Sequence, residues 1–130
     1  MPWVEVFAVL IVCHLVGDYL LQTDWQATNK RGGLGRDPVA RRALARHIAS
    51  YTLAFVPAFV WLADEIDLLL IPVVALIAVP HWIQDDGRLL TAYIRKVKGG
   101  DAAANPSVAA AADQTFHVVT LLLVAFLAGS

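Results

Sequence analysis

The sequence predicts an all-α fold, a four-helix bundle that spans a membrane. Of its 130 residues, 58% are hydrophobic and only 16% are charged, whereas about a quarter of a soluble domain is charged. Four apolar segments, 3–22, 43–63, 66–84 and 107–128, each come close to the ~20 residues that a helix needs to cross ~30 Å of hydrocarbon. No strand-like alternation competes with these helices. The length suits one integral membrane domain, residues 1–130.

Capping residues support two of the four segments. Asp37 with Pro38 predicts that the second helix begins in water before it enters the bilayer, and Asn105 with Pro106 predicts the start of the fourth. The segments "KRGGLG" and "KGGDAAANP" are predicted loops. Three prolines fall inside the predicted spans, where we expect kinks: Pro57, Pro72 and Pro80.

Charge sets the predicted orientation. All ten Lys and Arg residues lie in two stretches, 30–46 and 88–98, and the link "ADEID" between the second and third spans carries three acids and no base. The positive-inside rule therefore predicts that the basic loops 23–42 and 86–106 are cytoplasmic and that both termini are outside. We expect a multi-pass protein of the bacterial cytoplasmic (inner) membrane, with the lipid bilayer as its partner. A net charge of −1 predicts no nucleic-acid partner.

Residues 86–98 combine an apolar stripe with four basic residues. Leu89, Leu90, Tyr93, Ile94 and Val97 form the stripe. The pattern is typical of a short basic helix that lies on the inner leaflet. It is equally compatible with an extension of the third span into water.

Each of the four histidines has an Asp or Tyr four residues away, which places both members of a pair on one helix face. The pairs are His14 with Asp18, His47 with Tyr51, His81 with Asp85, and Asp113 with His117. His precedes Asp in the first and third spans, and the order is reversed in the fourth span, which runs in the opposite direction. The pairs are thus expected at one depth, near the cytoplasmic end. Polar side chains at membrane depth normally face the bundle interior, so we predict a shared polar centre.

Imidazole nitrogen and carboxylate oxygen form a ligand set suited to zinc, iron or manganese. The centre is predicted to hold one ion or a pair, and an open position would activate a water for hydrolysis. Neither H-E-x-x-H nor the Glu-x-x-His pattern of di-iron bundles is present. The candidate metal ligands are His14, Asp18, His47, His81, Asp85, Asp113 and His117, and the candidate supporting residues are Gln22, Tyr51, Gln84, Asp86 and Gln114.

Other functions use the same residues. The pairs can act as interhelical hydrogen bonds, worth about 0.6 kcal/mol each in a membrane bundle, in a non-catalytic partner subunit or a phage holin-like protein. They can also act as a proton relay, in a proton- or ion-coupled transporter subunit. Four helices are few for a transport pathway, so that alternative requires a homo-oligomer. Whether the chain is an enzyme stays open. Gly17 is expected to permit close helix approach beside Asp18.

The segments "HLVGDYLLQTDWQATNK", "HIASY", "HWIQD" and "DQTFH" together resemble an uncharacterised family of small bacterial multi-pass membrane proteins, domain of unknown function 3307. The resemblance covers nearly the whole chain. It includes an Ala-x-x-Lys after the opening motif, met by Ala27 and Lys30, and it departs at Arg88, where a Lys is expected. It implies the membrane fold and no particular activity.

Overall fold

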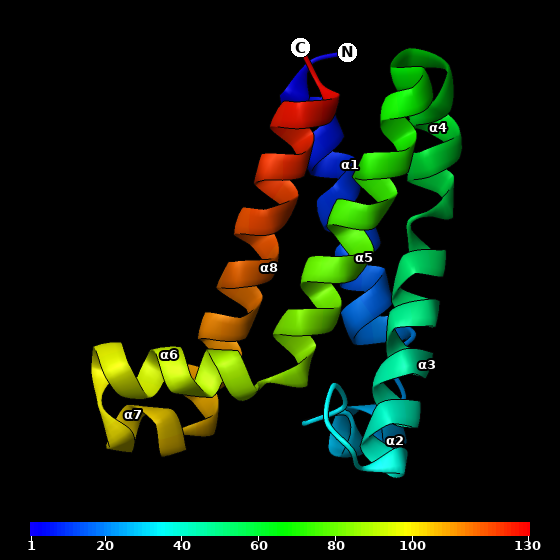
Figure 1. Ribbon diagram of the computed structural model, residues 1–130. Coiled ribbons are helices and arrows are strands. Elements are labelled where there is room, and N and C mark those ends of the chain that lie inside the picture. The colour runs from blue at the N-terminus through cyan, green and yellow to red at the C-terminus, as the bar shows by residue number, and fades with distance from the viewer.

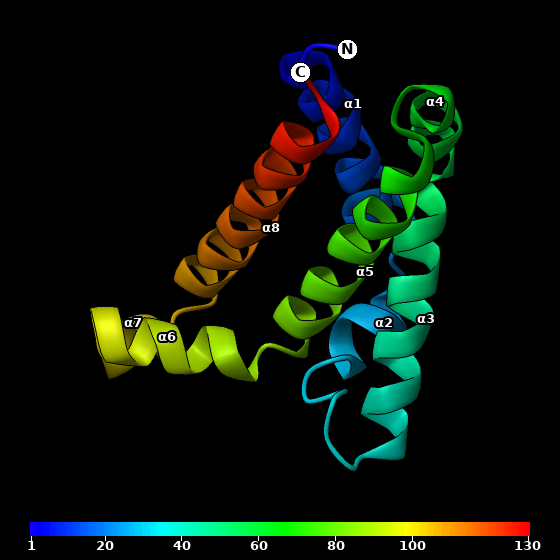
Figure 2. The same cartoon turned by 45° about the horizontal axis from the view of Figure 1, so that its top comes forward.

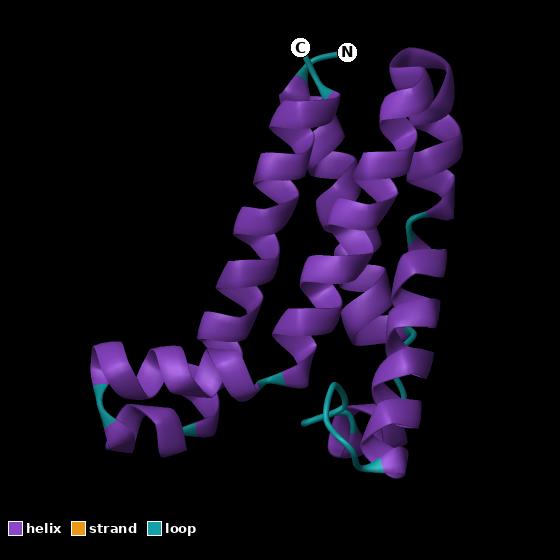
Figure 3. Ribbon diagram, viewed as in Figure 1, coloured by secondary structure: helices purple, strands orange, loops and turns teal.

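The computed structural model describes residues 1–130, and its regular structure is entirely helical (Figure 3). This confirms the predicted all-α class. The α-helices are α1 (Trp3–Leu15), α2 (Asp24–Asn29), α3 (Pro38–Ala54), α4 (Val56–Ile66), α5 (Leu70–Asp86), α6 (Arg88–Lys98), α7 (Gly100–Ala104) and α8 (Pro106–Ala128). A π-helical turn, η1 (Val16–Leu20), extends α1, and a 3-10 turn, η2 (Asp67–Leu69), joins α4 to α5.

Four helical columns lie side by side: α1 with η1, α3 stacked end to end with α4, α5, and α8 (Figures 1 and 2). The chain reverses between α4 and α5, where Asp67 has a φ of 46°. The two termini meet at one end, where the backbone N–H of Ser130 donates to the carbonyl of Met1 at 2.8 Å. The basic segments around α2, α3 and α6 lie toward the other end.

Three helical stretches are long and apolar enough to cross a membrane: Trp3–Leu20, Val56–Asp86 and Pro106–Ala128. The second stretch includes the reversal at Asp67, so it is a hairpin of α4 and α5 rather than one rod. The predicted span 43–63 is not one continuous helix, because a turn at Phe55 separates α3 from α4. Pro57, in the first turn of α4, has no backbone N–H to continue the α3 hydrogen-bond ladder.

The predicted helix starts are confirmed. The backbone N–H of Val39 donates to Asp37 Oδ1 at 2.9 Å, and that of Ser107 donates to Asn105 Oδ1 at 3.0 Å. Each cap of this kind contributes about 1 kcal/mol. Among the prolines in the predicted spans, only Pro80 lies in a helix interior, because Pro57 and Pro72 fall in the first turns of α4 and α5.

Two segments predicted as loops contain short helices. Helix α2 begins at a reciprocal cap, in which Thr23 Oγ1 accepts from the Gln26 N–H at 3.2 Å and Gln26 Oε1 accepts from the Thr23 N–H at 3.1 Å. Helix α7 forms in the "GDAAA" segment, where alanine favours the helix. The segment from Arg31 to Asp37 is a loop, as predicted.

Helix α6 is not an extension of α5. Gly87 ends α5 with a φ of 80°, a left-handed conformation that glycine adopts without strain. Helix α6 then runs across the ends of α5 and α8 (Figure 1). It buries Ile94 and leaves Leu89 and Val97 exposed. An amphipathic helix with exposed apolar side chains is the form expected at a lipid surface.

The apolar core occupies the half of the molecule nearer the termini. Its largest buried members include Leu10, Phe55, Leu62 and Ile77, which come from α1, the α3–α4 column and α5. The buried polar residues therefore gather in the other half, toward the basic end.

Candidate metal centre

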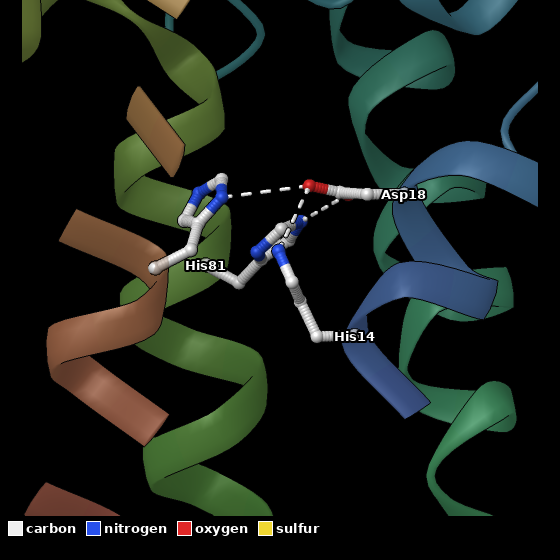
Figure 4. A group of neighbouring side chains, drawn as sticks. His14, Asp18 and His81 are labelled. Carbon is white, nitrogen blue, oxygen red and sulfur yellow. Dashed lines mark ion pairs between the residues drawn. The ribbon is translucent and has the colours of Figure 1, made fainter. Parts of the chain in front are cut away.

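Six of the seven predicted ligand residues are buried together between the helical columns. They are His14, Asp18, His47, His81, Asp85 and His117, and none has more than 7% of its surface exposed. Figure 4 shows three of them, His14, Asp18 and His81, pointing toward one another from α1, η1 and α5. The seventh residue, Asp113, lies at the edge, with 23% of its side chain exposed and its Oδ1 3.7 Å from His117 Nε2. The structure thus brings all seven to one place.

Four atoms in this cluster lie close enough together to share one metal ion. His47 Nε2 and His81 Nε2 are 3.1 Å apart. Asp18 Oδ1 lies 3.2 Å from each of these nitrogens, and Asp85 Oδ2 lies 2.7 Å from His47 Nε2 and 3.1 Å from His81 Nε2. Ligands bound at ~2.0 Å to a tetrahedral zinc ion are about 3.3 Å apart. The observed separations are close to that value.

Several atoms of the cluster are buried without a hydrogen-bond partner. Asp18 Oδ1, Asp85 Oδ1 and both ring nitrogens of His117 are in this state. Asp18 Oδ1 lies 3.2 Å from the Nε2 atoms of His47 and His81, but neither nitrogen forms a hydrogen bond with it. A buried polar atom without a partner costs about 1–3 kcal/mol. A cation between the four atoms would give Asp18 Oδ1 a partner.

The negative charge of the cluster must also be compensated. Asp18, Asp85 and Asp113 contribute three carboxylates, and Lys30 contributes one ammonium group 2.7 Å from Asp85 Oδ2. With neutral histidines the formal charge is −2. An uncompensated buried charge is costly in a medium of low dielectric, so the site must take up either protons or a metal ion.

His14 differs from the other three histidines because both of its nitrogens have partners. Tyr51 Oη lies 2.9 Å from His14 Nδ1, and Gln114 Oε1 lies 2.8 Å from His14 Nε2. Gln114 Nε2 donates to Asp18 Oδ2 at 3.1 Å, which fixes the orientation of the amide because a carboxylate only accepts. His14 Nε2 must then donate to Gln114, and Nδ1 accepts from the Tyr51 hydroxyl. The chain Tyr51–His14–Gln114–Asp18 holds the Asp18 carboxylate in place.

Local backbone features position Asp18 and Tyr51. Asp18 lies in the π-helical turn η1, a distortion often found at functional sites. A Cβ added to Gly17 would lie 2.7 Å from Tyr51 Cδ2, which confirms that this glycine permits close helix approach. The Tyr51 ring stacks on His81, with ring centroids 3.5 Å apart and planes inclined by 5°. Tyr51 therefore contacts two of the histidines.

Lys30 is part of the centre, although it was not among the predicted site residues. Its Nζ donates to Asp85 Oδ2 at 2.7 Å and to Gln22 Oε1 at 2.6 Å. The signal for it was the Ala-x-x-Lys segment that contributes to the family resemblance. Gln22 also donates to the carbonyl of Asp18 at 3.4 Å. The predicted supporting residues Gln22, Tyr51 and Gln114 thus all contact the cluster.

Two other expected supporting residues lie elsewhere. Gln84 donates to Thr120 Oγ1 at 3.0 Å and lines a cavity with Asp113, but it forms no hydrogen bond with the cluster. Asp86 accepts from the Leu34 N–H at 2.9 Å and from Arg88 Nε at 2.8 Å, so it anchors the 31–37 loop to the start of α6. Asp86 directly follows Asp85 on helix α5, so it is turned off the face that His81 and Asp85 share.

A family model described as "Protein of unknown function (DUF3307)" matches residues 6–130. The chain belongs to this family. No curated protein and no solved structure matches it. The matched range of the DUF3307 chain includes every residue of the polar centre, from His14 to His117.

Proposed function

We propose that this DUF3307 chain is a multi-pass inner-membrane protein with four helical columns, three of which hold a divalent transition metal near the cytoplasmic face. The observation that carries the proposal is the close grouping of His47 Nε2, His81 Nε2, Asp18 Oδ1 and Asp85 Oδ2, buried together with five of their separations between 2.7 and 3.2 Å. Two imidazoles and two carboxylates suit zinc, and also iron or manganese. The ligands come from three separate columns, so the ion would tie the bundle together.

The predicted membrane orientation has support in the distribution of charge along the columns. The acidic link Asp64–Asp67 and both termini are at one end of the columns, and the basic residues of α3 and α6 are toward the other. With the basic end in the cytoplasm, the metal centre lies in the cytoplasmic half of the bilayer. Helix α6 would lie along the inner leaflet, with its basic side chains near anionic lipid.

Single-cysteine labelling tests this orientation, because Cys13 is the only cysteine in the chain. In a Cys13→Ser background, a membrane-impermeant maleimide should label Ser130→Cys on intact spheroplasts. It should label Gly100→Cys only after the membrane is permeabilised. The opposite pattern would show that the basic end faces outward.

We infer that the chemistry of the centre is hydrolytic. The four protein atoms would fill a tetrahedral ion, so a coordinated water activated for attack would need a fifth position, which an iron or manganese ion offers. The chain itself orients the site, because Gln114, which is held by His14, donates to Asp18. Asp113 is the one carboxylate of the cluster with an exposed edge, so a substrate would approach the centre beside it.

Metal content is the direct test. The protein purified in mild detergent without chelators should contain at least one transition-metal ion per chain, measured by plasma mass spectrometry. His47→Ala and His81→Ala should each reduce that content by more than half. Gln84→Ala is the matched control, since Gln84 lies on the same helix as His81 but bonds to Thr120. A wild-type protein with no metal, and no uptake on reloading, would refute the proposal.

A second candidate, proton transfer in a transporter subunit, is favoured by one observation. The chain Tyr51–His14–Gln114–Asp18 is a continuous line of hydrogen bonds through the buried centre. In this role the protein would need to assemble as a homo-oligomer to form a pathway. Proton flux into liposomes that is abolished by Asp18→Asn and slowed by Tyr51→Phe would support it. Flux equal to that of empty liposomes would exclude it.

A further inference from the structure

A second group of ligand atoms lies next to the first, on the side of α8. His117 Nε2 is 3.3 Å from Asp85 Oδ1 and 3.7 Å from Asp113 Oδ1. His117 Nε2 and Asp85 Oδ1 are both buried and have no hydrogen-bond partner. Two unpartnered lone-pair atoms that face each other in a dry interior need a cation or a proton between them.

Asp85 connects this group to the first one. Its Oδ2 faces His47 and His81 at 2.7 and 3.1 Å, and its Oδ1 faces His117 at 3.3 Å. One carboxylate that offers a different oxygen to each of two ligand groups is in position to bridge two ions. Two-metal hydrolytic sites hold their ions about 3.5–4 Å apart.

We propose that the centre is dinuclear, with a second divalent cation bound by Asp85, Asp113 and His117 and bridged to the first through the Asp85 carboxylate. This rests on the proposed function, because the bridge requires the first ion. The second ion would have three protein ligands, which leaves coordination positions open, as in catalytic rather than structural sites.

One ligand of the second ion, Asp113, also lines a pocket. Asp113 lines a cavity of about 220 Å³ between α5, α6 and α8, whose walls are mainly apolar and include Leu89, Tyr93 and Phe116. Two divalent ions would change the formal charge of the cluster from −2 to +2, so an anionic group is the expected ligand. The occupant that fits is a lipid-like molecule with a phosphate head at the second ion and its chain against α6.

Metal stoichiometry in three proteins tests the dinuclear site: the wild type, Asp113→Asn and the control Asp101→Asn, whose carboxylate is exposed on α7. After loading with Mn²⁺ and removal of free metal, we expect two ions per chain in the wild type and the control, and one in Asp113→Asn. Electron paramagnetic resonance should show a spin-coupled pair in the wild type and an isolated Mn²⁺ in Asp113→Asn. Size-exclusion chromatography and circular dichroism establish that each variant is folded.

The outcomes separate the two proposals. One ion in the wild type, unchanged by Asp113→Asn, would overturn the dinuclear site and leave the proposed metal centre standing. No bound ion would overturn both. Two ions in both the wild type and Asp113→Asn would refute the assignment of Asp113 as a ligand.

Octyl phosphate serves as the probe for the pocket, with inorganic phosphate at the same concentration as its comparison. Octyl phosphate should change the Mn²⁺ spectrum of the wild type and leave that of Asp113→Asn unchanged, because Asp113, a ligand of the second ion, lines the pocket. An equal response to inorganic phosphate would show that the apolar walls contribute nothing to binding. An equal response in Asp113→Asn would place the phosphate elsewhere.

Discussion

Gly17→Ala tests whether the close contact between η1 and α3 shapes the metal centre. The added Cβ would lie 2.7 Å from Tyr51 Cδ2 and 3.3 Å from Tyr51 Cα, whereas carbon atoms pack at about 3.5–4.0 Å. The Tyr51 ring must therefore move by about 1 Å, or the two segments must separate by as much. Overpacking of this kind costs about 1–3 kcal/mol of folding free energy.

The movement would reach the metal ligands through two contacts. Tyr51 stacks on His81 at 3.5 Å, and its hydroxyl donates to His14, which orients Asp18 through Gln114. Displacing a residue that orients metal ligands typically weakens metal affinity about 10–100-fold. We expect Gly17→Ala to weaken zinc binding within that range, in addition to its loss of stability.

Gly100→Ala is the matched control, because a Cβ at Gly100 would meet no atom within 4 Å. Thermal unfolding in detergent should show a lower Tm for Gly17→Ala than for Gly100→Ala, and competition with a chromophoric chelator gives the two zinc affinities. If both variants unfold and bind zinc like the wild type, the close approach at Tyr51 does not constrain the site, and the reasoning fails.

Three further predictions concern single contacts. Tyr51→Phe keeps the stack on His81 and removes the hydroxyl bonded to His14 at 2.9 Å, so we expect a loss of about 1 kcal/mol in chemical unfolding and a smaller loss of zinc affinity than for Gly17→Ala. Lys30→Met removes the ammonium group that donates to Asp85 Oδ2, the same oxygen that is proposed to bind the metal ion. It should lower the Tm of the metal-free protein and raise zinc affinity in the chelator assay, and a lowered affinity would contradict competition between the two cations. Asn105→Ala removes the cap of α8 and should cost about 1 kcal/mol in the same unfolding assay without changing metal content.

The convergence of the site could be predicted because helical periodicity and chain direction together fix where a side chain points. A spacing of four residues places His14 with Asp18 on one face, and the reversed order of Asp113 and His117 on an oppositely directed helix brings them to the same level. This argument needs no tertiary contact. The helix starts at Asp37 and Asn105 were predictable for the same reason, since a capping bond is local in sequence.

The roles of individual residues could not be predicted from spacing. The four-residue spacing is the same for all four histidines. In the structure, however, both ring nitrogens of His14 have hydrogen-bond partners and neither ring nitrogen of His117 has one. That difference depends on which side chain from another helix lies opposite each ring. Lys30 reaches Asp85 from 55 positions away in the sequence, and no local pattern indicates such a contact.

Helix breaks were the other source of error. Helices α2 and α7 have only six and five residues, too few for a helical repeat of apolar residues to show in the sequence, so both lie inside segments predicted as loops. The predicted second span is interrupted at Phe55 because Pro57 has no backbone N–H to donate to the preceding turn. Hydropathy averaged over about 20 residues does not detect a break of one residue.

The separation of the apolar core from the polar centre has a consequence for how the site can be tested. Val6, Leu10, Phe55 and Leu62 are fully buried in the half near the termini. At about 1.5–3 kcal/mol for each large apolar side chain, this cluster can hold the columns together while the other half keeps unpartnered lone pairs. Functional sites commonly carry such local instability against a well-packed remainder. Single substitutions at His47 or Asp113 should therefore change metal content in a bundle that still folds, and loss of the fold in every such variant would mean that the polar centre is itself the principal source of stability.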